Sequence, residues 1–119
     1  RQKSWRPLRR IGSVKNEYGA KLDKNGYAPS IIPFVEGCCW CGRDGDLVRH
    51  EIFGGTGRRE KSKRLGLWVH LCPACHEAVH SGKSSFLPLL QLGEMSARNT
   101  YGWSKEKFIR EFGKSYLED

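Results

Sequence analysis

Two pairs of cysteines in this sequence have the spacing of metal-binding clips. Cys38 and Cys41 form one Cys-x-x-Cys pair, and Cys72 and Cys75 form a second pair, with 30 residues between the pairs. Each loop is short enough for both thiolates to reach one ion, and two such loops complete a tetrahedral site that favours a structural Zn²⁺. The fifth cysteine, Cys39, is left over, either as a small buried residue or as an alternative ligand.

A group of histidines is the second candidate metal site. His76 and His80 stand four residues apart in "CHEAVHSGK", which places both on one face of a helix, where they can share an ion. His50, in "VRHEIF", is the natural third ligand, and Glu51 lies beside it. Three histidines with open positions can hold a hydrated divalent ion (Mg²⁺, Mn²⁺, Ni²⁺ or Zn²⁺). Such an ion can polarise a phosphate and stabilise the leaving oxygen of a phosphodiester.

A single-ion alternative combines the second clip with the two histidines that follow it, as Cys72, Cys75, His76 and His80. This arrangement leaves the first clip without a partner. It also strains one tetrahedron, because two adjacent residues would both be ligands. We therefore prefer two separate ions.

These residues need a scaffold, and the sequence predicts the order strand, loop, strand, helix. The strands are expected at Leu47–Phe53 and within "LGLWVHLC" (65–72), both rich in β-branched and apolar residues. A short helix is predicted from Pro73 to His80, because proline suits its first position and Gly82 follows its end. The segment "GGTGRREKSKR" between the strands is predicted to be a loop because of its glycines. It carries five basic residues that we expect to face the site and contact DNA: Arg58, Arg59, Lys61, Lys63 and Arg64.

Flanking segments complete a single α+β domain over residues 1–119, with the zinc-stapled core at 36–83. Residues 1–35 are predicted to be a basic arm with turns, including a short strand in "SIIPFVEG". Its first ten residues carry Arg1, Lys3, Arg6, Arg9 and Arg10. Residues 84–119 are predicted to be a helical extension. In it, "SSFLPLLQLGEM" is a short helix or hook, and Ser104 caps an amphipathic helix through "KEKFIREFGKSYL".

Composition limits the classes of function. The chain has 119 residues, of which 38% are hydrophobic, with a mean hydropathy of −0.62, so its core is modest and would gain from a metal staple. A net charge of +8 and a pI near 9.5 favour a polyanionic partner, most simply nucleic acid. The sequence has no apolar run long enough for a membrane span and no secretory signal, so we expect a reducing cytoplasm.

Taken together, these motifs resemble the HNH endonucleases, the ββα-metal nucleases. "CHEAVHSGK" is similar to the metal-binding helix of colicin DNase domains, and the paired Cys-x-x-Cys clips are similar to the zinc-stapled HNH branch. "RHEIFGG", followed by a basic segment and "GLWVHLCPACH", resembles small HNH proteins of phages and prophages. The resemblance covers about residues 36–83.

The resemblance implies a metal-dependent endonuclease that acts on double-stranded DNA with low sequence specificity. His50, His76 and His80 would be ligands of the catalytic ion, and Glu51 would occupy the position of the general base. The reverse assignment, with His50 as base and Glu51 as ligand, stays open. The resemblance also implies a phage or prophage protein in the cytoplasm of a bacterial host, with a phage or host protein as a possible partner. No pattern indicates an oligomeric state.

This chain departs from the HNH pattern at two positions. The usual base is a histidine where this chain has Glu51, and the usual loop-bracing asparagine is replaced by Leu67, so backbone bonds through "LGL" would have to hold the loop. An unperturbed glutamate is a weaker base than imidazole at neutral pH. Two alternatives therefore remain: a non-catalytic zinc-stapled DNA-binding module derived from the HNH fold, and a zinc-ribbon adaptor that binds protein.

Overall fold

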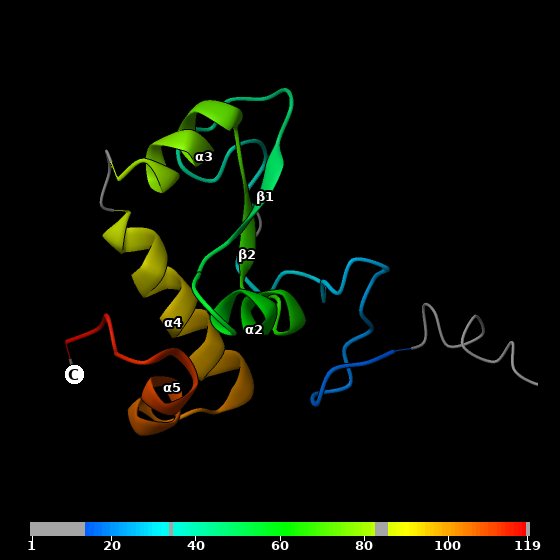
Figure 1. The fold of residues 1–119 in the computed structure, drawn as a ribbon, viewed down its shortest axis with the longest axis vertical. Helices are drawn as coiled ribbons and strands as arrows, with labels where there is room; N and C mark the ends of the chain where they lie inside the picture. Colours follow the sequence, from blue (N-terminus) through cyan, green and yellow to red (C-terminus); the bar gives the residue numbers. More distant parts are fainter. Residues whose placement is uncertain (1–13, 34, 83–85, 119) are drawn as a thin grey trace, which may run out of the picture.

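The computed structural model describes residues 14–33, 35–82 and 86–118. The predicted basic arm over the first ten residues lies outside these ranges, as do Phe34 and the two serines that begin "SSFLPLLQLGEM". In chain order the described elements are strand β1, helix α2, strand β2 and helices α3, α4 and α5 (Figure 1). The chain is thus a small α+β structure.

The sheet is a two-stranded antiparallel hairpin. β1 (Val48–Glu51) pairs with β2 (Trp68–Leu71), and His50 lies opposite Val69. Both strands are shorter than predicted, although the Ile52 N–H still donates to the Leu67 carbonyl at 3.0 Å beyond the assigned ends. α3 (Pro73–His80) has the predicted bounds, with proline in its first turn, and it follows β2 directly. This hairpin and helix carry all three histidines of the candidate site.

The connection between the strands contains a helix, so the predicted loop was wrong over these residues. α2 spans Arg58–Arg64. The glycines precede this helix instead of interrupting it: Gly57 occupies the N-cap with a φ of 78°, a conformation that glycine adopts without strain. Glu60 lies in the first turn and basic residues in the last, which suits the helix dipole. α2 lies across the lower end of the hairpin (Figure 1).

α4 (Leu87–Tyr101) is a 15-residue helix, much longer than the predicted short helix or hook. Gly93 lies in its middle, where glycine costs stability relative to alanine. This position nevertheless requires glycine, because a Cβ on residue 93 would lie 2.9 Å from Ile52 Cγ2 and 3.0 Å from the Phe53 ring. The glycine thus lets α4 approach the segment that follows β1.

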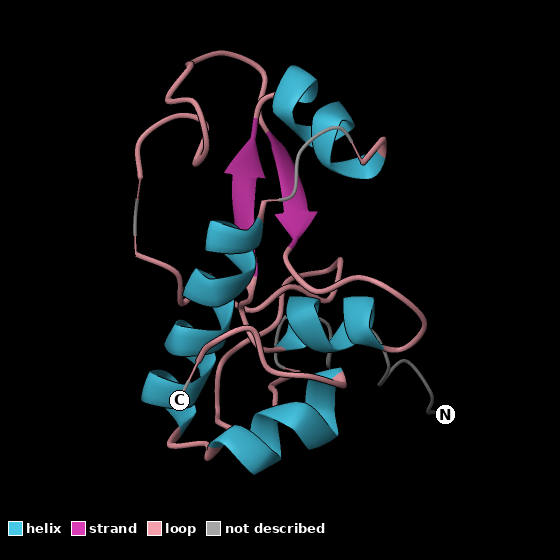
Figure 2. Cartoon of the chain, turned by 90° about the vertical axis from the view of Figure 1, so that its left-hand side faces the viewer, coloured by secondary structure: helices cyan, strands magenta, loops and turns pink. Residues whose placement is uncertain are grey.

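α5 (Lys105–Phe112) begins as predicted, since the Ser104 hydroxyl accepts a hydrogen bond from the Lys107 N–H at 3.0 Å. It ends at Gly113 and does not continue through the predicted "KSYL". Phe108 and Phe112 on this helix are buried against Phe53, with ring centroids 5.3 and 4.6 Å away. α4 and α5 therefore share one core with the hairpin (Figure 2).

The C-terminal tail is fastened by a buried carboxylate. Glu94 on α4 is fully buried and receives hydrogen bonds from Arg98, from the Ser115 hydroxyl and from the Tyr116 N–H. Burying a carboxylate is costly unless it is paired, and here three donors surround it. The segment after Phe112 is thereby fixed against α4.

Residues 14–33 pack along α2 and β2. The Asn16 side chain donates to the Arg64 carbonyl at 2.6 Å, and the Ala28 N–H donates to the Lys63 carbonyl at 2.9 Å. The described part of "SIIPFVEG" is not a strand; its Ile31 N–H donates to the Gly66 carbonyl at 2.9 Å. In the ranges that the structure covers, no helix has the length and apolar character needed to cross a membrane.

Candidate metal centres

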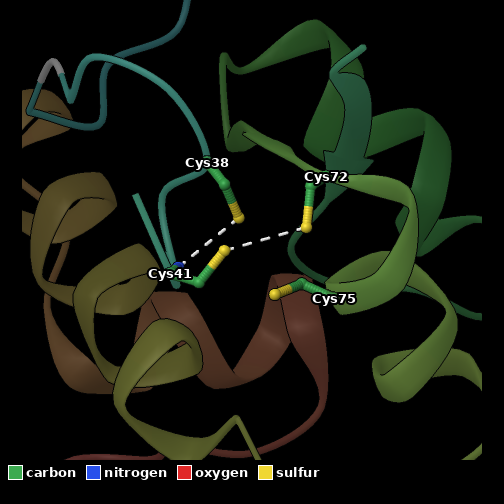
Figure 3. A group of neighbouring side chains, drawn as sticks. All are labelled: Cys38, Cys41, Cys72 and Cys75. Atoms are coloured by element: carbon green, nitrogen blue, oxygen red, sulfur yellow. Dashed lines mark hydrogen bonds between the residues drawn. The ribbon is translucent and has the colours of Figure 1, made fainter. Parts of the chain in front are cut away.

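The four clip cysteines come together at one point. Cys38, Cys41, Cys72 and Cys75 have sulfur atoms within 4.8 Å of one another (Figure 3). Cys41 Sγ and Cys72 Sγ are 3.8 Å apart. A tetrahedral zinc with Zn–S bonds near 2.3 Å needs sulfur atoms about 3.8 Å apart, so this group fits a zinc ion.

Two local structures hold the cysteines in place. The first clip is a tight turn closed by the Gly42 N–H, which donates to the Cys38 carbonyl at 2.8 Å. The second clip is the start of α3, with Cys72 at its N-cap. The Cys39 N–H donates to the His70 carbonyl at 2.8 Å and joins the first clip to β2. Cys39 itself is half-buried and outside the four-sulfur group, so it is not a ligand in this arrangement.

The pKa values of the clip thiols shift in opposite directions. Burial opposes ionisation of Cys38, but hydrogen bonds from nearby backbone N–H groups outweigh it and lower its pKa. Hydrogen bonding with the Cys75 backbone likewise lowers the pKa of Cys72. Burial and the neighbouring thiols raise the pKa of Cys75. Neighbouring thiolates repel one another, and a divalent ion bound between them would remove this repulsion.

The three histidines form a separate group. His50, His76 and His80 have ring nitrogens within 4.8 Å of one another, and the Nε2 atoms of His76 and His80 are 3.0 Å apart. Zinc–nitrogen bonds of about 2.0–2.1 Å place two ligand nitrogens at a similar separation. β1 supplies one ligand and one face of α3 supplies the other two, so this group can also hold a metal ion.

The charge state of the histidine group suits metal binding. His50 is only 7% exposed, and its burial, followed by the proximity of His76 and His80, lowers its pKa to about 4. Burial and His80 also lower the pKa of His76. Both imidazoles are therefore neutral at neutral pH, the form that donates a lone pair to a metal.

The structure separates the two groups along α3. Cys72 and Cys75 meet the first clip, whereas His76 and His80 meet β1. The alternative in which these four residues surround one ion is therefore wrong.

Glu51 is held by two side chains. The Tyr27 hydroxyl donates to Glu51 Oε2, and Arg59 Nε donates to Oε1 at 3.0 Å. Partial burial would raise the pKa of Glu51, but these two hydrogen bonds outweigh it and the pKa is lowered. Burial and the carboxylate in turn raise the pKa of Tyr27 to about 12. Glu51 is thus an ionised carboxylate with both oxygens engaged.

Two residues that support the site had no role in the sequence prediction. Tyr27 is 24 residues from Glu51 and carries no local signal that links them. Ser62 is fully buried, and its hydroxyl donates to the Phe53 carbonyl at 2.9 Å and accepts from the Phe53 N–H at 3.1 Å. The one sequence feature that could have indicated the burial of Ser62 is that it is a small polar residue within a run of charged residues.

The backbone of Ser62, together with that of Leu67, supports the connection between β1 and β2. The Ser62 carbonyl accepts from the Leu67 N–H at 2.8 Å, and the Leu67 carbonyl accepts from the Ile52 N–H. The predicted backbone bonds through "LGL" are present, and the serine adds side-chain bonds to them. Leu67 itself is a fully buried core residue.

The five basic residues of α2 do not share one direction. Arg59 is directed to Glu51, while Lys63 lies over the Tyr27 ring at 4.9 Å. The remaining three serve other contacts: Lys61 pairs with Glu111 at 3.2 Å, Arg64 pairs with Glu17 at 2.9 Å, and Arg58 covers Gly113. The expectation that all five face the site was therefore wrong, because a helix directs them to different sides.

A cavity of about 390 Å³ opens beside the histidines. Its polar end is formed by His50, Glu51, Arg59 and His80, which belong to β1, α2 and α3. Of the five basic residues on α2, Arg59 is the one that borders this cavity. The site therefore combines a possible metal, a carboxylate and a guanidinium at one opening.

The chain matches no known family model, no curated protein and no solved structure. The likeness to HNH endonucleases therefore rests on the motifs alone. The four-cysteine and three-histidine groups rest on the geometry described above.

Proposed function

We propose that this protein is a metal-dependent endonuclease that hydrolyses phosphodiester bonds in DNA. One observation carries the proposal: the chain has two metal-binding groups of different construction. Four thiols complete a coordination shell, whereas three histidines leave positions for substrate. The histidine group lies at a cavity that also holds a carboxylate and a guanidinium, the groups that such a hydrolysis needs.

Each group at the cavity has a role in this proposal. A divalent ion at the histidines supplies Lewis acidity to a phosphate oxygen. Arg59 orients the phosphate with its guanidinium, which is 60% exposed. Glu51 accepts a proton from the attacking water, and Tyr27 keeps the carboxylate in position.

Cationic side chains favour DNA as the polymer. The net charge of +8 attracts phosphates in a manner that depends on salt and not on base sequence. α2 follows the short connection after β1, so it brings Arg59 close to the histidines. We therefore propose low sequence specificity.

Plasmid cleavage in Mg²⁺, Mn²⁺, Ni²⁺ or Zn²⁺ tests the proposal. We expect His76→Ala to abolish nicking while the far-UV circular dichroism spectrum is unchanged. His70→Ala is the matched control, because His70 is an exposed strand histidine outside the three-histidine group. If His76→Ala cleaves as fast as the parent protein, the proposal is wrong.

DNA affinity should distinguish the two sides of α2. Arg59→Ala should weaken binding to a short duplex by about fivefold to tenfold and reduce the salt dependence, because a phosphate contact is lost. Lys61→Ala should change the affinity less, because the Lys61 ammonium pairs with the Glu111 carboxylate and also donates to the Glu111 backbone carbonyl. Equal effects in fluorescence anisotropy would contradict the assignment of Arg59.

A second candidate is a non-catalytic zinc-stapled module that binds DNA. The state of Glu51 favours it, since Tyr27 and Arg59 engage both of its oxygens and its pKa is lowered. This candidate predicts retardation of DNA in a gel without cleavage in any of the four metals.

A further inference from the structure

The cavity beside the histidines is also lined by side chains that hydrolysis alone does not require. Five of them have no hydrogen-bonding groups and are together called the apolar end: Ile52 directly after β1, Val79 on α3, Phe86 at the N-cap of α4, and Leu89 and Leu90 on α4. A phosphate on a metal and a guanidinium would occupy only the polar end. The volume of about 390 Å³ lies within the range of about 300–1,000 Å³ that is typical of sites for small organic ligands.

The apolar end is built around a residue in an unusual conformation. Phe86 has a φ of 48° and is the one residue other than glycine with a positive φ in the part of the chain that the structure describes. Such a conformation is costly for an aromatic residue and persists only when the surroundings enforce it. Its ring is 4% exposed and stacks on Trp40 with centroids 4.2 Å apart.

Trp40 connects this wall to the cysteine group. It lies between Cys39 and Cys41 in the first clip, so the turn that holds Cys41 also holds the backbone of Trp40, whose 42% exposed side chain stacks on Phe86. Leu89 is also buried, at 4% exposure, whereas Leu90 is only half-buried. The apolar end is therefore a fixed surface with one accessible leucine. The beginning of α4 and the end of α3 lie on the same side of the hairpin (Figure 1).

We propose that the cavity binds one unpaired nucleotide, with its phosphate at the polar end and its base against Leu89, Leu90 and the Phe86 ring. This inference rests on the proposed function and specifies its substrate as single-stranded or locally unpaired DNA. A base in a duplex is stacked on its neighbours and can enter such a cavity only by leaving the helix. A base on an apolar and aromatic surface is bound with little regard to its identity, because every base has a π-face.

The geometry supports a nucleotide over a purely apolar ligand. The apolar side chains and the histidines line one continuous cavity. With a divalent ion at the histidines, this lining matches a molecule that has both an anionic group and a flat ring. Gly54 and Gly55 also line the cavity and contribute no side chain, so a ring can approach the backbone there.

A pair of ligands that differ only in the base tests the inference. Deoxyadenosine monophosphate and deoxyribose phosphate would be titrated into the full chain loaded with Zn²⁺, with binding followed by calorimetry. We expect the nucleotide to bind about tenfold more tightly, because stacking of a base is favourable. Leu90→Ala should bring the affinity for the nucleotide close to that for the sugar phosphate. Met95→Ala, which alters an exposed side chain of α4 outside the cavity, should preserve the tenfold difference.

Equal affinities of the parent protein for the two ligands, or binding of neither ligand, would overturn the inference. Cleavage of one oligonucleotide as a single strand and as a duplex is the second arm. Faster cleavage of the single strand supports the inference, and equal or slower cleavage contradicts it. Preferential binding of the nucleotide without cleavage in any metal would instead remove the proposed function and leave the nucleotide site in place.

Discussion

The two candidate metal-binding groups share one helix but differ in how they are built. The cysteine group joins two segments that are 30 residues apart, and Cys38 and Cys72 are 0% and 2% exposed. The histidine group joins β1 to the adjacent α3, and His80 is exposed. Each group also has a member of the other kind, since Cys41 is exposed and His50 is buried. The contrast is therefore in what each group joins: a group that ties distant segments stabilises the fold, whereas a group at a cavity is available to a ligand. α3 thus carries two members of the cysteine group at its first turn and two members of the histidine group along one face.

The largest expected effect follows from removing a cysteine ligand. Cys38→Ser should prevent folding at 37 °C, because structural zinc contributes about 10–16 kcal/mol in small zinc domains, as much as a whole domain's net stability. Thermal unfolding by circular dichroism, together with zinc content, measures this change. Cys39→Ser is the matched control, since the neighbouring thiol is outside the four-sulfur group, and it should retain zinc. A folded, zinc-free Cys38→Ser protein would remove the distinction between the two groups.

The histidine group should behave in the opposite way. His80→Ala removes an exposed ligand, so we expect the free energy of unfolding to change by no more than about 0.5 kcal/mol. The number of tightly bound ions should fall from one in each group to the cysteine-bound ion alone. Elemental analysis after dialysis measures this change, with His70→Ala as the control. Loss of zinc from the cysteine group in His80→Ala would show that the groups are coupled.

How far the sequence predicted each region depends on the range of the interactions that build it. The bounds of Pro73–His80 are encoded locally, by the proline at its start and Gly82 after its end, and the sequence predicted them correctly. α2 was missed because it has little apolar periodicity. Its contacts to the rest of the chain run through Ser62 and through charged side chains, and the glycines before it resemble a loop signal. The length of α4 was also missed, and the glycine within it has a tertiary explanation, because a Cβ at Gly93 would meet Ile52 and Phe53.

The same distinction between local and long-range interactions applies to the candidate site. Ligand spacings within each clip and along α3 are local, so both metal groups could be predicted from the sequence. The partners of Glu51 depend on tertiary contacts, because Tyr27 reaches it from a segment 24 residues earlier. The direction of each basic residue on α2 was also unpredictable once this segment was taken for a loop. Arg59 and Lys61 point to different sides because both residues lie on a helix, and this helix was not predicted from the sequence.

A smaller effect should come from the serine that supports the connection after β1. Ser62→Ala leaves the Phe53 N–H and carbonyl without their buried partner, which should lower the free energy of unfolding by about 1–3 kcal/mol, less than the loss expected for Cys38→Ser but more than that for His80→Ala. Urea denaturation measures this difference. Ser81→Ala, which alters an exposed hydroxyl at the end of α3, should change stability much less. Equal effects of the two substitutions would mean that Ser62 does not brace the connection between the two strands.

The smallest effect concerns the side of α2 that faces away from the cavity. The hydrogen bond from Lys107 and, to a smaller extent, that from Lys61 lower the pKa of Glu111 against the opposing effect of burial. A carboxylate with a lowered pKa in the folded state stabilises the protein above its unfolded pKa of about 4.5, and this contribution disappears as the pH falls through the folded value. Because the three side chains are 26–41% exposed, Glu111→Gln should cost only about 0.2–1 kcal/mol at pH 7. The difference from the parent protein should vanish in acid and shrink in high salt. Urea denaturation at several pH values measures it, and a difference that persisted in acid would show that Glu111 acts through packing and that Lys61 is free for DNA.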